Sequence, residues 1–264
     1  MSDDSTRAAR LYEPFAERYH LIYEDWWAAA EIEGEVLDNL LRAEGVAPPG
    51  PLLDCTCGIG TQALPLAALG WSVTGTDLTP AAVDRARREA AERGIALEVG
   101  VADVRRLGDA LGDRTFAAVL TCDNALPHLQ TEEDLGAALG SIAGRLVPGG
   151  LLLATVRDYD AVLADRPTGI APWTMGRPGA RRVMTQAWWW DPSGAPAYDF
   201  DLFVLEEGAG EDGGWRTTHV DGRYRAWRRA ELVAAVEAAG YVDVRWLAEG
   251  TGWYQPVILA RRPS

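Results

Sequence analysis

The chain has 264 residues, 48% of them hydrophobic and 24% charged, enough to bury one large core with or without an insertion. Asp and Glu total 39 against 25 Lys and Arg, and the formal net charge of -14 disfavours nucleic acid as a partner. We find no leader sequence and no run of roughly 20 apolar residues, so we expect neither secretion nor membrane insertion. The three cysteines lack the spacing of a disulfide framework, which favours a reducing, cytoplasmic setting.

The first 48 residues have helical periodicity. Their large apolar side chains recur every three or four positions, so they fall on one face of a helix: Tyr12, Phe15, Tyr19, Ile22 and Tyr23. A packed amphipathic helix explains this pattern. A segment with three prolines, residues 45–51, then separates the helical region from a strand.

A strand, a tight turn and a helix are predicted from Leu52 onward. The strand ends at Asp54, and Gly58 and Gly60 form the turn before a run of Ala and Leu. Glycines let a ligand approach the backbone, and the helix N-terminus behind them leaves free amide N–H groups. Asp54 places a carboxylate beside this gap, which suits a nucleotide-like ligand that carries a positively charged amino group.

A second strand, residues 70–77, ends in Asp77, which lies 23 positions after Asp54. In nucleotide-binding βαβ units, an acidic residue about 20 positions further on binds the ribose hydroxyls. Ala63 occupies the third glycine position of the dinucleotide fingerprint, and alanine is permitted there. The pattern therefore predicts a nucleotide site and leaves a nicotinamide cofactor open.

Strands and helices alternate through the next segment. A helix opened by Thr79 and Pro80 is followed by strands at residues 97–101 and 116–121. This alternation predicts a parallel sheet with helices on both faces and with ligands outside the carboxyl ends of the strands. Four carboxylates lie at those ends: Asp54, Asp77, Asp103 and Asp123.

Polar residues follow the fourth strand, where a plain core would stay apolar. Asp123, Asn124 and His128 lie within six positions, and His128 has the strongest claim among the histidines to a chemical role. By contrast, Cys55-x-Cys57 has no second Cys or His pair nearby, so we expect packing there and no metal.

The pattern changes between residues 164 and 227. β-forming runs separated by Gly, Pro and Ser predict an inserted antiparallel sheet that is dense in aromatic residues. A helix at 229–239 and strands at 242–246 and 255–262 then end the chain.

These motifs resemble the class I S-adenosylmethionine-dependent methyltransferases. The matching positions are Asp54-x-x-x-Gly58-x-Gly60, then Asp77, then Ala102-Asp103-Val104. The resemblance implies that the two glycines border the methionine part of S-adenosylmethionine, that Asp77 binds the ribose, and that Asp103 binds the adenine amine. It assigns further residues to the same cofactor site: Tyr19, Asp54, Leu78, Val104 and Cys122.

Other segments are similar to the glycine N-methyltransferase-like subgroup. They are Asn124-x-x-x-His128-Leu129, Pro148-Gly149-Gly150 and Arg157-Asp158-Tyr159-Asp160, where the subgroup has Arg-Asn-Tyr-Asp. The first 48 residues resemble the N-terminal lid of small-molecule methyltransferases, whose aromatic rings would attract a sulfonium. The resemblance implies acceptor contacts from Trp27, Asn124, Arg157 and Tyr159. The predicted catalytic residues are Asp123, His128 and Tyr23, and an acceptor that must lose a proton would find its base among Asp123, His128 and Asp158.

The predicted fold is α/β and Rossmann-like, with a doubly wound, mostly parallel seven-stranded sheet whose last strand is antiparallel. The predicted segments are an N-terminal helical lid (1–48), the S-adenosylmethionine-binding core (49–163), an antiparallel β insertion that forms the acceptor pocket (164–227), and the C-terminal part of the core sheet (228–264). A homodimer is compatible with this arrangement.

The predicted function is S-adenosylmethionine-dependent methylation of a small molecule, preferably N-methylation of an amine. The alternative is C- or O-methylation of an indole- or phenol-like acceptor. A nicotinamide-dependent reductase would need a Tyr-x-x-x-Lys or similar pair, and the last two thirds of the chain contain no lysine. A third interpretation is a protein that binds S-adenosylmethionine without catalysis. The polar cluster of Asp123, Asn124 and His128 favours an enzyme instead.

Overall fold

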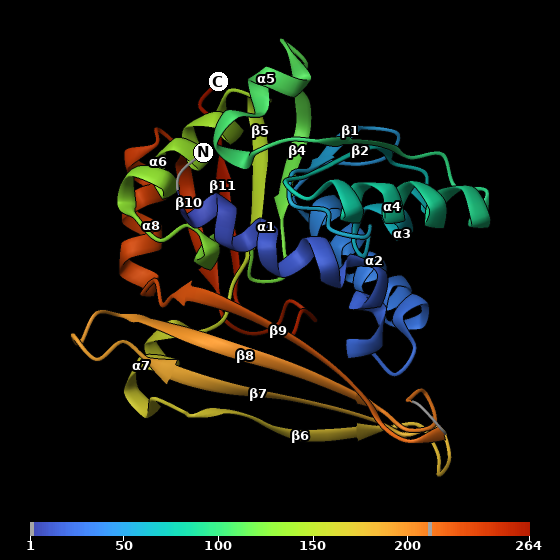
Figure 1. Cartoon of the computed structure of the whole chain (residues 1–264). Coiled ribbons are helices and arrows are strands. Elements are labelled where there is room, and N and C mark those ends of the chain that lie inside the picture. The colour runs from blue at the N-terminus through green and yellow to red at the C-terminus, as the bar shows by residue number, and fades with distance from the viewer. Residues whose placement is uncertain (1–2, 211–212) are drawn as a thin grey trace.

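Two β-sheets organise the protein. The computed structural model describes residues 3–210 and 213–264. The larger sheet has seven strands with helices on both faces, and the smaller, four-stranded sheet lies against one end of this core (Figure 1). Helix α1 (Asp3–Phe15) runs along β9 (Arg216–Arg225) of the smaller sheet and contacts α4 (Pro80–Arg93) of the core, so it connects the two parts.

The larger sheet has the predicted Rossmann-like order, β10-β11-β5-β4-β1-β2-β3. Strands β1 to β5 run parallel to one another. The last strand, β11, is antiparallel to both of its neighbours, β5 and β10, as the sequence predicted. The strands are β1 (Pro51–Asp54), β2 (Ser72–Asp77), β3 (Glu98–Val101), β4 (Phe116–Thr121), β5 (Leu146–Thr155), β10 (Val242–Leu247) and β11 (Val257–Arg261).

Alternate strand residues point to opposite faces of the sheet and pack against different helices. Leu53, Val119 and Leu152 belong to the layer under α5, α6 and α8, whereas Leu52 and Leu120 belong to the layer under α2 and α3. The helices are α2 (Trp26–Ala43), α3 (Ala63–Ala68), α4 (Pro80–Arg93), α5 (Leu107–Leu111), α6 (Glu132–Ala143), α7 (Tyr159–Asp165) and α8 (Arg229–Ala238). Both faces are thus buried at the centre of the sheet, which explains the consecutive apolar residues of β1, β4, β5 and β11.

The smaller sheet is antiparallel, with the order β6-β7-β8-β9. The sequence predicted three of its strands: β7 (Arg182–Trp190), β8 (Ala197–Glu206) and β9 (Arg216–Arg225). It missed the edge strand β6 (Gly169–Met175), because Gly169 and Pro172 are residues that disfavour strands except at edges. Leu11 and Phe15 of α1 pack on one face of this sheet, beside Trp188, Phe200 and Tyr224.

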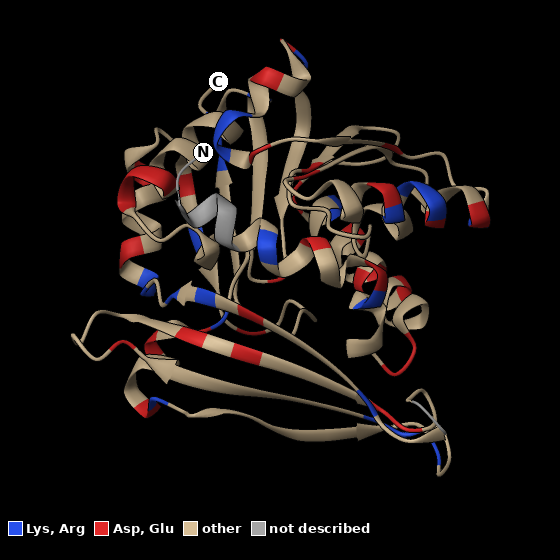
Figure 2. Cartoon of the chain, viewed as in Figure 1, with Lys and Arg blue, Asp and Glu red and all other residues tan. Residues whose placement is uncertain are grey.

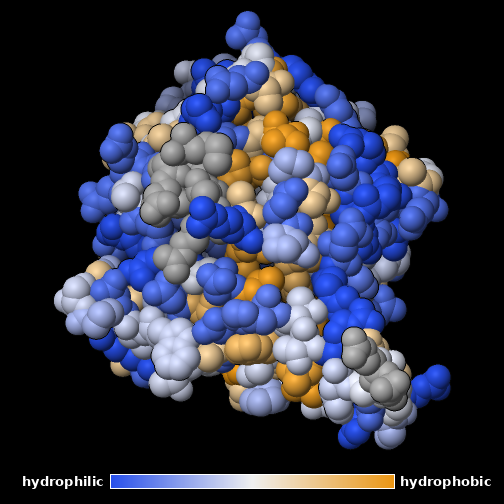
Figure 3. Space-filling model, viewed as in Figure 1, coloured by the Kyte–Doolittle hydropathy of each residue, from blue (hydrophilic) through white to orange (hydrophobic). Residues whose placement is uncertain are grey.

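Charged side chains are spread over the outer helices and over the strands of the smaller sheet (Figure 2). Apolar residues reach the surface mainly in the middle of the same face, between the core and the smaller sheet (Figure 3). Among the described residues, no helix combines the length and the apolar character that crossing a membrane requires.

Candidate active site

One cavity collects most of the residues assigned to the cofactor from the sequence. It lies at the carboxyl ends of β1, β2 and β4 and is covered by α1 and by the 3-10 helix η1 (Ala16–Ile22). The cofactor residues that line it are Tyr19, Gly58, Asp77, Leu78, Asp103, Val104 and Cys122. Two predicted catalytic residues, Asp123 and His128, line the same cavity.

The glycine turn brings backbone amides to the cavity. Gly60 has a φ of +95°, and a Cβ at this position would lie 2.8 Å from Cδ1 of Leu64, so only glycine fits. At Gly58, with a φ of +53°, no atom lies within 4 Å of where a Cβ would be. The backbone of Gly58 is therefore open to a ligand, while Gly60 shapes the turn from behind.

Asp54 lies just behind the cavity wall and is fully buried. Its Oδ1 accepts a long hydrogen bond of 3.4 Å from the amide of Thr56, whereas its Oδ2 has no hydrogen-bond partner. Burial raises the pKa of Asp54 to about 7. A buried acceptor without a partner is costly unless a ligand or water satisfies it. Asp54 can thus stabilise a positively charged group bound in the cavity.

Asp77 is held rigidly at the end of β2. Its Oδ2 accepts the amide N–H of Gly58 at 2.9 Å, and its Oδ1 accepts that of Thr79 at 2.9 Å. Burial raises the pKa of Asp77 although both bonds favour the carboxylate. The carboxylate therefore joins the glycine turn to the second strand and faces the cavity, where hydroxyl groups of a ligand could donate to it.

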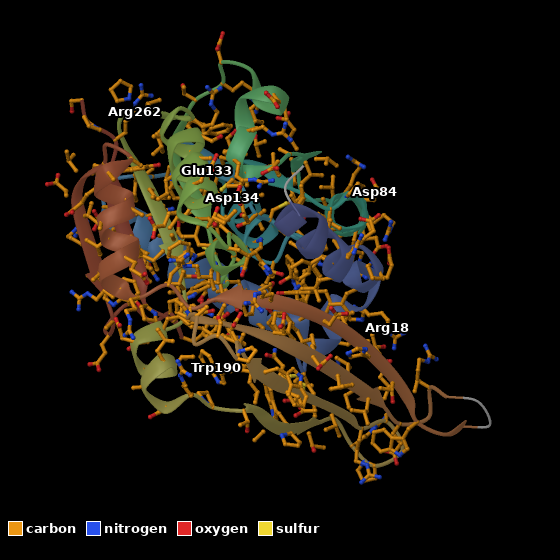
Figure 4. The ribbon with its side chains drawn as sticks, turned by 60° about the vertical axis from the view of Figure 1, so that its left-hand side comes forward. Arg18, Asp84, Glu133, Asp134, Trp190 and Arg262 are labelled. Atoms are coloured by element: carbon orange, nitrogen blue, oxygen red, sulfur yellow. The ribbon has the colours of Figure 1, made fainter. Side chains whose placement is uncertain are left out.

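Asp103 is paired with Arg105. The amide, Nε and Nη2 of Arg105 donate to its carboxylate at 3.0, 3.0 and 2.6 Å, and Nη1 of Arg105 donates to Asp134 of α6 at 2.5 Å (Figure 4). Burial opposes ionisation, but these bonds hold the pKa of Asp103 below its ordinary value. Arg105 thus fixes the acid that the resemblance assigns to the adenine amine.

Phenol groups surround Asp123 beyond β4. Tyr19 and Tyr23 donate to its Oδ2 at 3.1 and 3.5 Å, and the hydroxyl of Tyr254 donates to its Oδ1. Burial and the Asp123 charge raise the pKa values of Tyr19 and Tyr23 well above the ordinary tyrosine value. The phenols therefore stay protonated and donate to the carboxylate.

His128 contacts a residue that the sequence did not assign to the site. The hydroxyl of Tyr12 lies 3.0 Å from Nε2 of His128, and the imidazole packs on Tyr224 with ring centroids 4.7 Å apart. Burial, together with the positive charge of Arg157, lowers the pKa of His128 to about 4. The imidazole is therefore neutral near pH 7. Tyr12 lines the cavity and was visible in the sequence only as a member of the aromatic helix face.

The residues assigned to the acceptor do not line this cavity. Asn124 and Tyr159 are buried and joined by a hydrogen bond of 3.0 Å, and the amide of Arg157 donates to Oδ1 of Asn124 at 3.1 Å. The guanidinium of Arg157 lies over the rings of Trp188 and Tyr224. Their contacts with an acceptor stay a prediction.

Trp27 and the inserted sheet also lie outside the cavity lining. The guanidinium of Arg93 lies 4.4 Å from the ring centroid of Trp27, beside Trp26. Among the described residues of 164–227, none is part of this lining, and the role of the inserted sheet as the acceptor pocket stays a prediction. Tyr224 of the sheet packs on His128, and the inner face of the sheet packs on α1. The described residues contain no cluster of His, Cys, Asp and Glu suited to a metal ion.

Comparison with known proteins identifies the class. Residues 52–150 match the family described as "Methyltransferase domain". The match shows that residues 52–150 form a methyltransferase domain. The seven-stranded sheet with acids at its strand ends is the class I methyltransferase fold, whose cofactor is S-adenosylmethionine.

The chain is also similar to individual proteins, in sequence or in fold. A glycine/sarcosine N-methyltransferase of Parasynechococcus marenigrum (strain WH8102) is 34% identical over 152 residues, which make up 57% of this chain and 52% of that protein. The chain thus spans about half the length of that curated relative. DesVI of Streptomyces venezuelae shares the fold, with a TM-score of 0.73, 24% identity and coverage of 97% and 98% of the two chains. The sugar N-methyltransferase KedS8 from Streptoalloteichus sp ATCC 53650 does so at a TM-score of 0.72 and 22% identity, over 93% of each chain.

The cavity fits S-adenosylmethionine. The open backbone at Gly58 and the free Oδ2 of Asp54 suit a methionine part that carries positive charge. The fixed carboxylates of Asp77 and Asp103 suit hydroxyl and amine donors of the adenosine part.

Proposed function

We propose that this protein transfers a methyl group from S-adenosylmethionine to the nitrogen of a small amine. The observation that carries the proposal is the position of Asp123: a carboxylate held by phenol groups, in the wall of the cofactor cavity. An ammonium group is a natural partner for such a carboxylate. The printed names of the similar glycine/sarcosine and sugar N-methyltransferases support nitrogen as the acceptor atom.

When bound, S-adenosylmethionine would supply a methyl group on a sulfonium to the acceptor nitrogen, with S-adenosylhomocysteine as the leaving group. The main task of the protein is to hold donor and acceptor aligned, which contributes on the order of 7 to 11 kcal/mol in well-oriented systems. In our proposal, Asp123 receives the proton that the ammonium must lose before its lone pair can attack. Tyr19 and Tyr23 keep the carboxylate aimed at the cavity.

Burial, with the charge of Arg157, lowers the pKa of His128 to about 4, so the imidazole is uncharged at neutral pH and is a weak base for an amine and for a phenol alike. We assign His128 to positioning, through its contact with the hydroxyl of Tyr12.

Mass-spectrometric detection of methyl uptake tests the proposal. The purified protein is incubated with S-adenosylmethionine and with separate pools of primary and secondary amines, phenols and indoles. We expect products from the amine pool only. Asp77→Ala should abolish cofactor binding in calorimetry, and Asp123→Asn should lower kcat at least tenfold without changing that binding. Methylation confined to phenols or indoles would refute the proposal.

A further inference from the structure

A loop from the end of the chain completes the surroundings of Asp123. Residues 248–256 connect β10 to β11, and this loop carries Tyr254, whose hydroxyl donates to Oδ1 of Asp123. Tyr19 and Tyr23 occupy the other oxygen, Oδ2. Phenols from two distant parts of the sequence thus meet on one carboxylate. The side chain of Tyr254 is 62% exposed, so its ring lies between the carboxylate and solvent.

The loop is anchored on one side of Tyr254 and has glycines before it. Trp253 is buried beside residues of α2, and its ring stacks on Tyr254 with centroids 5.6 Å apart and an interplanar angle of 27°. Gly250 and Gly252 have φ values of +78° and +77°, a conformation that other residues rarely adopt. The two glycines therefore permit the turn that places Tyr254 beside the anchored Trp253 ring.

Two polar atoms that flank Tyr254 lack partners. Nε1 of Trp253 and Oε1 of Gln255 are buried, and neither forms a hydrogen bond with the described residues. Buried polar groups are nearly always satisfied by protein, water or ligand. Ordered water or a ligand would therefore complete the bonding of this loop on both sequence neighbours of Tyr254.

The same region is electrically negative. Burial raises the pKa of Glu33 to about 7, and the negative charge of Asp123 contributes to this rise, so the two carboxylates repel each other electrostatically. Among the described lining residues the one arginine is Arg105, and it is bonded to Asp103 and Asp134. This end of the site therefore favours a cation, and the faces of tyrosine rings attract cations as well.

We propose that Tyr254, together with Tyr19, Tyr23 and Asp123, encloses the ammonium group of the acceptor, and that Tyr254 limits its size. The acceptor class is then a compact alkylammonium compound. This inference rests on the proposed function. It adds the recognition of the charge and a specificity-determining residue.

Binding of unreactive probes tests the cation site without turnover. Choline and its neutral analogue 3,3-dimethylbutan-1-ol are titrated into the protein saturated with S-adenosylhomocysteine, and affinity is measured by calorimetry or ligand-observed NMR. We expect choline to bind at least tenfold more tightly than the alcohol. Tyr254→Ala should weaken choline binding at least fivefold. Equal binding of both probes, or a Tyr254→Ala variant with unchanged choline affinity, would overturn the proposal.

A matched control comes from the opposite side of the smaller sheet. Trp189 is 61% exposed, and Trp188, its neighbour on the strand, belongs to the inner cluster, so Trp189 points outward. Trp189→Ala should change the affinity for choline by less than twofold. A loss as large as that of Tyr254→Ala would show a general effect of removing an exposed aromatic ring and would count against a specific site.

Turnover separates this inference from the proposed function. For a series of amines of increasing branching, Tyr254→Ala should raise the kcat/KM of bulky amines relative to small ones at least tenfold. Methylation of amines with an unchanged size preference would refute the role of Tyr254 and leave N-methylation intact. Methylation of phenols or indoles only, with Tyr254-dependent choline binding, would refute N-methylation and support the cation site.

Discussion

Asp123 and Asn124 are adjacent non-glycine residues with left-handed backbones, at φ values of +59° and +65°. Such conformations cost of order 1 to 3 kcal/mol each and persist where the surroundings enforce them. Here Thr155 enforces them, because its Oγ1 accepts the amide of Asp123 at 2.8 Å and its backbone oxygen accepts that of Asn124 at 3.1 Å. In this backbone conformation, the side chain of Asp123 lines the cavity and that of Asn124 is buried.

Asp54 illustrates how a binding residue lowers stability. Its pKa is about 7 in the folded protein, against about 4 for an unperturbed Asp, so the folded state loses stability as pH rises from 4 to 7. Asp54→Asn keeps the acceptor for Thr56 and removes the buried charge. We expect it to raise the free energy of unfolding of the ligand-free protein at pH 8 by roughly 2 to 4 kcal/mol, measured by urea denaturation.

The pH dependence is the control for this prediction. At pH 4 the folded wild-type protein holds Asp54 neutral, so the gain from Asp54→Asn should shrink to a small fraction of its value at pH 8. The variant should also bind S-adenosylmethionine more weakly. A stability gain of equal size at both pH values would show that buried charge is not its cause.

His128 makes a prediction about the pH dependence of the rate. Its pKa of about 4 keeps the imidazole neutral above pH 5, so it cannot produce an inflection in kcat between pH 5.5 and 9. We expect His128→Gln to lower kcat several-fold through the lost contact with Tyr12, while the shape of the pH profile stays the same. A limb with a midpoint between 6 and 7 that disappears in this variant would instead establish His128 as the base.

At the scale of elements, two arginines attach the N-terminal segment that we predict to be a lid to the inserted sheet. Arg182 of β7 donates to the backbone oxygens of Leu21 and Glu24 at 3.1 and 2.7 Å, immediately around Tyr23. Arg18 of η1 (Figure 4) forms an ion pair with Glu206 of β8. The inserted sheet therefore holds in place the segment whose tyrosines reach Asp123.

Removing the hydrogen bonds from Arg182 should make the N-terminal segment around Tyr23 more mobile. Arg182→Ala is expected to weaken S-adenosylmethionine binding roughly three- to tenfold, since each hydrogen bond from a charged group contributes about 1.5 to 3 kcal/mol before relaxation. Limited proteolysis should become faster within residues 16–25, and S-adenosylmethionine should protect the same sites. Arg181→Ala is the matched control, because Arg181 pairs with Glu207 and does not contact the lid. Similar behaviour of both variants would contradict the assignment.

At the scale of the whole molecule, α1 joins the inserted sheet to the core. Phe15 is 1% exposed and packs among residues of the smaller sheet, while the contacts of α1 with α4 belong to the core. Neither part can lose α1 without exposing apolar surface. We therefore expect the chain to unfold as one cooperative unit.

Phe15→Ala tests this coupling. Loss of a buried phenylalanine costs about 3 to 5 kcal/mol, and the transition should stay single, with tryptophan fluorescence and far-UV circular dichroism changing at the same urea concentration. Ile32→Ala, at a residue that is 65% exposed, should change stability by less than about 0.5 kcal/mol. Two separated transitions in the variant would show that the smaller sheet folds independently.

Local patterns of the sequence were sufficient for the sheet and for the cofactor end of the site. Alternation of strands and helices fixes which residues follow the strand ends, and parallel strands bring those ends to one edge. Gly58, Asp77, Asp103 and Asp123 could therefore be placed from spacing alone. The same reasoning missed β6, an edge strand whose Gly and Pro disfavour the strand signal.

The acceptor end depended on tertiary structure. Asp123 and Tyr254 are 131 positions apart, and nothing in the sequence near either residue specifies their contact. The sequence also does not show that Asn124 and Tyr159 satisfy each other's hydrogen bonds in the interior, away from the cavity. Periodicity and spacing specify which residues follow the strand ends, and this was sufficient to predict the nucleotide site. Which polar groups meet a ligand and which meet each other is decided only when distant segments pack together.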